Sequence, residues 1–163
     1  AAQTLTQLLG ANGYKTESVA IRGIIDSRPF QVFEGSNEML YTQITEMVTR
    51  QMNRLKNMNL ASFLKNYELT QRTSSHFKGL TNFTIDENLP QRKQVGLGKI
   101  LSRIISADYV ATLGNKGFRN DLVNNSIDMI KQEVSGLVNS FHYSKQVHPV
   151  TDYNGKSSWA DYS

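Results

Sequence analysis

Apolar residues recur along most of the chain at steps of three and four, the spacing of one face of an α-helix. The two longest stretches with this pattern cover residues 92–113 and 118–143. No stretch alternates apolar and polar residues long enough for a sheet. The sequence therefore predicts an all-α fold, a helical bundle. The predicted helices cover residues 1–10, 17–25, about twenty residues after Ser36, 60–67, 92–113 and 118–143.

Glycine, proline and asparagine mark the expected ends of these helices. Gly10 suits a C-terminal cap, and the loop 10–14 that it opens holds two glycines and an asparagine. In the helix 17–25, the inward residues are expected to be Val19, Ala20, Ile24 and Ile25. The expected breaks are the segment from Pro29 to Ser36, residues 57–60, the fading of a helix near 73–80, the loop 79–90 and the turn 114–117.

The last two long helices are predicted to form an antiparallel hairpin, because the turn that joins them is short. Their apolar faces are too extensive for water, so they should pack on each other and on the helix after Ser36, or on a second copy of the chain. The residues expected to face the partner helix are Ile100, Ile104, Leu122, Ile130, Val134 and Leu137.

Composition narrows the class of protein. The chain has 163 residues, 39% of them hydrophobic and 20% charged, enough for one domain with its own core. It has no cysteine, which excludes disulfides and thiolate sites, and its three histidines have no metal-ligand spacing, so no metal site is expected. The net charge of +4 is scattered, which argues against nucleic acid. No apolar stretch reaches bilayer length, so a membrane is not expected.

One acidic residue stands in a context that suits catalysis. Glu34 lies between the apolar Phe33 and Gly35, and Ser36 then suits the N-cap of the next helix. A carboxylate held out of bulk water becomes a stronger base, glycine permits a substrate to approach the backbone, and free helical N–H groups attract anions. On this segment alone, an ordinary turn before a capped helix is the simpler interpretation.

The segment does not stand alone, however. "QLLGANGYKTE", residues 7–17, followed by "DSRPFQVFEGSNE", residues 26–38, resembles the C-terminal end of the acyl-CoA dehydrogenases. That family has a Gln-x-x-Gly-Gly-x-Gly-aromatic loop, an Arg-Asp-Ala-like stretch and an aromatic-Glu-Gly-Thr motif that opens a helix. The resemblance covers residues 1 to about 50. The chain departs from the family pattern at Ala11, Ser36 and Tyr41.

The resemblance implies a role for each matching residue. Glu34 would be the base that removes the α-proton of an acyl-CoA thioester, while FAD accepts the β-hydrogen. The cofactor-binding residues would be Gln7, Gly10, Gly13, Ser36 and Glu38, and the glutamine-glycine loop would reach the FAD of a neighbouring subunit. The resemblance also implies an electron acceptor such as electron-transfer flavoprotein, a homo-oligomer, and a cytoplasmic location in a bacterium or a mitochondrial one in a eukaryote.

Three segments follow from this comparison. Residues 1–57 would end the dehydrogenase-like C-terminal domain, residues 58–143 would be a helical extension, and residues 144–163 a loose polar tail. The chain is then expected to be the C-terminal part of a longer FAD-dependent acyl-CoA dehydrogenase, inactive and without FAD by itself. The alternative is a non-catalytic helical module, derived from that family, that serves interaction or oligomerisation.

Overall fold

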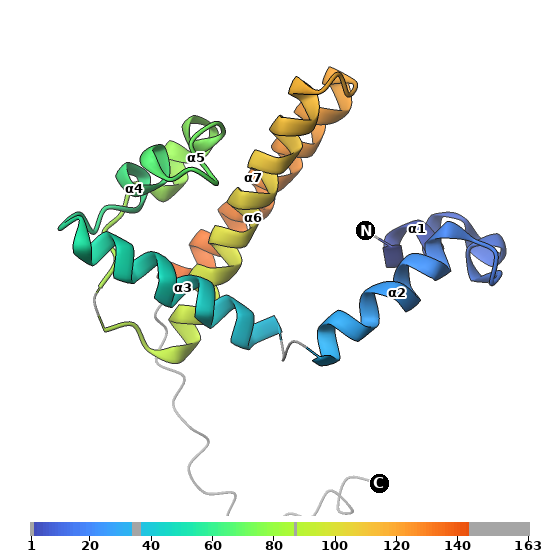
Figure 1. Cartoon of the computed structure of the whole chain (residues 1–163), viewed down its shortest axis with the longest axis horizontal. Helices are drawn as coiled ribbons and strands as arrows, with labels where there is room; N and C mark the ends of the chain where they lie inside the picture. Colours follow the sequence, from blue (N-terminus) through green and yellow to red (C-terminus); the bar gives the residue numbers. More distant parts are fainter. Residues whose placement is uncertain (1, 34–36, 87, 144–163) are drawn as a thin grey trace, which may run out of the picture.

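The computed structural model describes residues 2–33, 37–86 and 88–143, and most of them lie in helices (Figure 1). The described residues form no strand, and their one β-type pairing is a single bridge between Asn59 and Thr84. The prediction of an all-α fold is therefore confirmed. The helices are α1 (Ala2–Leu8), the 3-10 helix η1 (Gly10–Tyr14), α2 (Val19–Phe33), α3 (Asn37–Arg54), α4 (Leu60–Asn66), α5 (Ser74–Thr81), α6 (Gln91–Asn115) and α7 (Asn120–His142).

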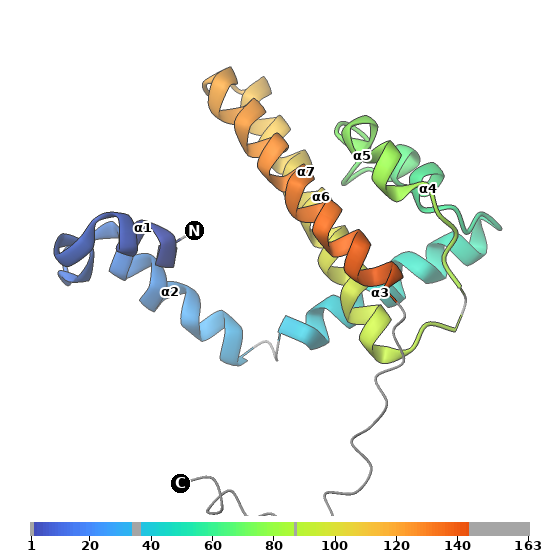
Figure 2. The ribbon, with the colours of Figure 1, turned by 180° about the vertical axis from the view of Figure 1, so that it is seen from behind.

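The centre of the molecule is the hairpin of α6 and α7, which lie side by side along their length (Figures 1 and 2). A short turn joins them, and Gly117 adopts φ +94° there, a conformation that favours glycine. The predicted antiparallel hairpin is confirmed. Ile100, Ile104 and Val134 are fully buried, and Ile130 and Leu137 are half-buried against the core. Leu122 was also predicted to face the partner helix, but 53% of it is exposed.

Helix α3 crosses α6 at close range. This contact joins the two segments that the sequence analysis divides at residue 57. The Thr45 Oγ1 hydroxyl donates a hydrogen bond to the backbone oxygen of Gln94, at 2.6 Å. At Gly98 a Cβ atom would overlap the backbone of Tyr41. The core around this crossing consists of Val48, Met52, Leu60, Phe63, Leu64, Phe77, Ile85, Leu89, Leu97, Ile100, Leu101, Ile104, Ala107, Val134, Val138 and Phe141.

Helices α4 and α5 cover one side of the hairpin. Asn59 is the N-cap of α4, and its side chain accepts a hydrogen bond from the backbone N–H of Ser62, at 2.9 Å. Helix α5 was not predicted as a separate element, because the sequence suggested that a helix fades near residues 73–80. It forms because Phe77 and Thr81, one helical turn apart, are both completely buried.

Helices α1 and α2 and the segment η1 contact one another, and they stand apart from the α6–α7 hairpin in Figure 1. The prediction that Pro29 breaks the helix is wrong, because α2 continues from Val19 through Pro29 to Phe33. The φ angle of proline is itself helical, so only one backbone hydrogen bond is lost. The expected inward face is also partly wrong. Ala20 is buried and Ile24 half-buried, whereas Val19 and Ile25 are 78% and 59% exposed.

The length and apolarity of the described helices show whether any of them could cross a bilayer. None of them combines the length and the apolarity that crossing a bilayer requires. Residues 144–163, the predicted polar tail, lie outside the described part of the chain.

Candidate functional site

The backbone of the glutamine-glycine loop favours glycine at position 10 and requires it at position 13. Gly10 follows α1 with φ +55°, in the left-handed region, and has open space on its Cα. Gly13 is buried, and a Cβ atom there would overlap the backbone of Thr6. The loop therefore folds back onto α1 at a distance that only glycine allows. Gln7 lies on the last turn of α1 and is exposed, so its amide is accessible to a ligand or a partner.

The base and one cofactor residue predicted from the sequence, Glu34 and Ser36, lie outside the described residues. Glu38 does lie within them. It is exposed and occupies the first turn of α3, where a carboxylate complements the helix dipole, as the sequence predicted. Helix α3 begins at Asn37, directly after the Glu-Gly-Ser segment, which agrees with the predicted helix start.

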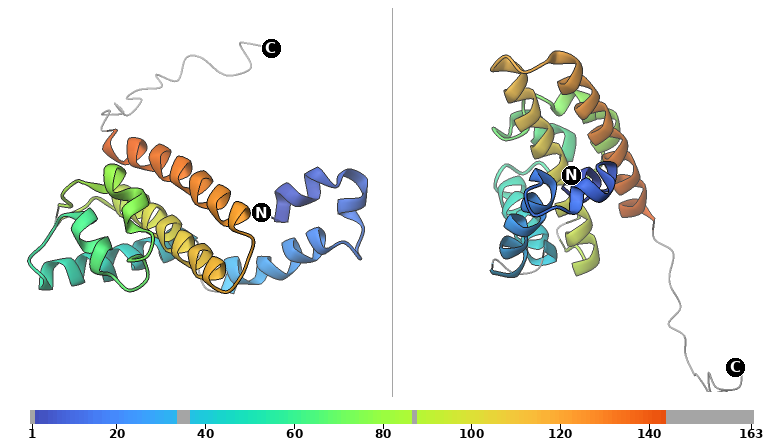
Figure 3. Two further views of the ribbon diagram at one scale, coloured as in Figure 1. Left: turned by 90° about the horizontal axis from the view of Figure 1, so that it is seen from above. Right: turned by 90° about the vertical axis from the view of Figure 1, so that its right-hand side faces the viewer.

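The described candidate residues do not form one cluster within the chain. The loop η1 lies at the start of α2, and Glu38 lies beyond the end of α2, on the next helix (Figures 1 and 3). Gln7, Gly10 and Gly13 therefore cannot share one pocket with Glu38 in the same protomer. The resemblance assigns the loop to the FAD of a neighbouring subunit, and a separated loop is compatible with that assignment.

A hollow of about 1150 Å³ that the sequence did not indicate opens between the starts of α3 and α6 and the end of α7. Glu38 contributes to its lining, together with the cationic residues Arg92, Lys93 and Lys99. These cations and Glu38 are far apart in the sequence, and only the packing of α3 on α6 brings them together. No periodicity or motif could have located this hollow, because it depends on how three helices cross.

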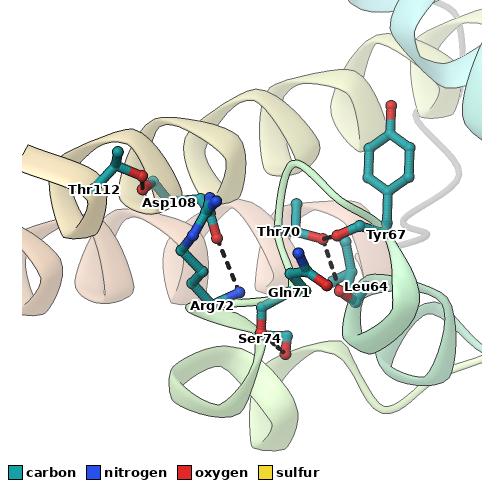
Figure 4. A network of polar contacts seen from close by, with 8 residues as sticks. All are labelled: Leu64, Tyr67, Thr70, Gln71, Arg72, Ser74, Asp108 and Thr112. Atoms are coloured by element: carbon teal, nitrogen blue, oxygen red, sulfur yellow. Dashed lines mark hydrogen bonds and ion pairs between the residues drawn. The ribbon is translucent and has the colours of Figure 1, made fainter. Parts of the chain in front are cut away.

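An ion pair between a buried carboxylate and a half-exposed guanidinium fixes the segment between α4 and α5 to α6 (Figure 4). Asp108 is 3% exposed, and its carboxylate accepts hydrogen bonds from the backbone N–H of Arg72, at 3.0 Å, and from its guanidinium Nη1, at 2.6 Å. Thr70 stabilises the same segment by donating its hydroxyl hydrogen to the backbone oxygen of Leu64, at 2.7 Å. A small hollow of about 220 Å³ adjoins the pair. Since both carboxylate oxygens are engaged, the pair serves structure.

No group of three or more His, Asp and Glu side chains within residues 2–33, 37–86 and 88–143 could hold a metal ion.

Comparison with known proteins identifies no relative, because no family model, no curated protein and no solved structure matches the chain.

Proposed function

We propose that this chain is the C-terminal helical part of an FAD-dependent acyl-CoA dehydrogenase, in which Glu34 removes the α-proton of an acyl-CoA thioester. The observation that carries the proposal is the glutamine-glycine loop. The loop backbone favours glycine at Gly10, which has a positive φ, and requires glycine at Gly13, which contacts the backbone of Thr6. The motif residues therefore match the family in sequence and also determine the backbone conformation of the loop.

Two further features support the proposal. The helix expected after the Glu-Gly motif begins at Asn37 and has Glu38 in its first turn, as the motif requires. The loop and that helix lie at opposite ends of α2, so the loop is available to a second subunit. The resemblance implies that FAD, when bound, supplies the acceptor for the β-hydrogen.

The chain's own residues would divide the work as follows. Glu34 would take the proton from the α-carbon, and the neighbouring Gly35 would leave room for the thioester against the backbone. Ser36 would contact the cofactor with its hydroxyl group. Gln7 would donate an amide hydrogen bond from the loop of the adjacent subunit. By itself the chain is expected to be inactive, because most of the FAD site would lie outside it.

The test of this proposal is Glu34→Gln in the full-length enzyme. The change removes the base and keeps almost the same volume, so FAD should stay bound while the rate of acyl-CoA dehydrogenation falls on the order of a hundredfold or more. Flavin absorbance measures cofactor retention, and reduction of an artificial electron acceptor measures turnover. The matched control is Glu17→Gln, an exposed carboxylate before α2, which should leave the rate unchanged. Near-normal turnover of Glu34→Gln would place the base elsewhere.

A second candidate function is a non-catalytic interaction or oligomerisation module. It is favoured by the apolar residues that α1, η1 and α2 leave exposed, which are Leu5, Leu8, Leu9, Tyr14, Val19 and Ile25. Burial of such residues against a partner would stabilise the complex. The two candidates separate in one experiment: an enzyme that loses turnover in Glu34→Gln supports catalysis, and a full-length protein without flavin and without turnover supports the module.

A further inference from the structure

The hollow between α3, α6 and α7 is open and slightly larger than a typical small-molecule site. Its volume is about 1150 Å³, and it lies where the first turns of α3 and α6 meet the last turns of α7. Ligand sites in proteins commonly have volumes of about 300–1000 Å³ and combine an apolar lining with a few polar groups. This hollow has both parts, on different helices.

The polar part has three cations and one carboxylate, that of Glu38, so its charge is positive overall. Arg92, Lys93 and Lys99 line the hollow, and none of the three has a carboxylate partner among the residues that the structure describes. Lys93 and Lys99 are instead held over aromatic rings: the Nζ atom of Lys93 lies 5.5 Å from the ring centroid of Phe141, and that of Lys99 lies 5.9 Å from the ring centroid of Tyr41. Contacts of this kind orient an ammonium group without neutralising it.

The first turn of α6 has positive side chains, whereas negative side chains stabilise the N-terminal end of a helix. Its first turn contains Arg92 and Lys93 and no acidic residue, and Pro90 caps it without a side-chain hydrogen bond. The N-terminal end of a helix carries partial positive charge, so cations there are unfavourable for the free protein. An anion bound against this end would satisfy the first-turn N–H groups and the two cations together.

The apolar part comes from α6 and α7. Val95, Leu137 and Phe141 line the hollow beside the cations, and Leu137 and Val95 are half-buried. We propose that this hollow binds a small phosphate monoester with an apolar arm. Arg92 and Lys93 hold the phosphate, Lys99 supplies a third positive charge, and the arm lies on Val95, Leu137 and Phe141. The phosphate site does not use Glu34 itself, although Glu38 of the expected cofactor-binding set lies at the edge of the same hollow.

The test uses the whole 163-residue chain and hexyl phosphate as the probe, with binding measured by calorimetry and by amide chemical shifts in NMR. We expect saturable binding, with the largest shifts at Gln91, Arg92 and Lys93. Inorganic phosphate, which lacks the arm, should bind at least about tenfold more weakly, and hexanol, which lacks the charge, should not bind at these amides.

The decisive variant is Arg92→Ala combined with Lys93→Ala. Both side chains are at the surface or half-buried, so the helical circular dichroism signal should be preserved, while the dissociation constant of hexyl phosphate should rise about tenfold or more. The matched control removes the same charge elsewhere, with Lys78→Ala and Lys131→Ala, and should change the dissociation constant less than about twofold.

Three results would overturn the proposal. The first is the absence of saturable binding of hexyl phosphate. The second is equal weakening in the two double variants, which would mean a general effect of net charge. The third is equal affinity for inorganic phosphate and hexyl phosphate, which would remove the role of the apolar wall. None of them depends on turnover or on Glu34, so the site stands or fails independently of the proposed enzyme.

Discussion

The N-terminal helices α1 and α2 differ from the helices α3 to α7 in where their apolar side chains lie. From α3 onward, apolar residues of all five helices form one buried cluster with the loop residues Ile85 and Leu89. In α1 and α2, Ala20 is the one described apolar side chain that is fully buried, and Leu8 and Val19 are 81% and 78% exposed. The N-terminal helices therefore leave apolar surface uncovered, whereas the helices after them have a core of their own.

The largest expected effect compares one apolar residue from each region. Ile104→Ala removes a fully buried side chain of α6 and should lower the free energy of unfolding by about 2–5 kcal/mol. Leu8→Ala, at an exposed position of α1, should change it by less than about 0.5 kcal/mol. Urea unfolding followed by circular dichroism measures both. If Leu8→Ala proves as destabilising as Ile104→Ala, the N-terminal helices have a buried contact in solution, and the two regions are more alike than described.

A smaller effect is expected at the crossing of α3 and α6. A Cβ atom at Gly98 would overlap the backbone of Tyr41, so Gly98→Ala should force the helices apart and lower the free energy of unfolding by about 1–3 kcal/mol. Gly136 on α7 has no atom within 4 Å of such a Cβ atom, so Gly136→Ala should raise stability by about 0.4–1 kcal/mol. Opposite signs in the two thermal melts are the expected result. A stabilised Gly98→Ala would show that α3 does not rest on α6.

The smallest effect is expected from the ion pair of Arg72 and Asp108. Asp108→Asn keeps the shape of the side chain and loses the charge, and the guanidinium is half exposed, so the loss of stability should be about 1–2 kcal/mol. Its matched control is Asp121→Asn, which changes a fully exposed pair with Arg119 and should leave the unfolding midpoint almost unchanged. Equal midpoints for the two variants would mean that the buried pair contributes no more than the exposed one.

The control pair also has a defined pH dependence. The hydrogen bond from the Arg119 side chain lowers the pKa of Asp121 below its ordinary value. A carboxylate with a lowered pKa stabilises the folded state at pH values above its unfolded pKa, and this contribution disappears as the pH falls through the lowered value. The pair is solvent-exposed, so salt should weaken its contribution further.

The sequence predicted the helices that have their own apolar face. Helices α3, α6 and α7 each present buried residues at helical spacing over many turns, so periodicity alone identified them. Periodicity did not predict helix α5, because its eight residues include one large buried side chain, Phe77. Pro29 predicts a break because proline removes a backbone hydrogen bond, whereas its helical φ lets α2 continue to Phe33.

The candidate site was predictable only in its local parts. The glycine requirements at Gly10 and Gly13 follow from the motif and agree with the backbone. The hollow that contains Arg92, Lys93 and Lys99 was not predictable, since it results from three helices that are distant in the sequence.

The crossing of α3 and α6 also constrains how the protein is made. The hydrogen bond from Thr45 to Gln94 joins residues 49 positions apart, whereas the α6–α7 hairpin closes through a short turn. During synthesis α3 leaves the ribosome first, and the helix that it crosses, α6, follows only later. At about 5–20 residues per second, that interval lasts on the order of seconds. During this interval the apolar face of α3, with Val48 and Met52, is accessible to chaperones. Slow codons between α3 and α6 would prolong that exposure.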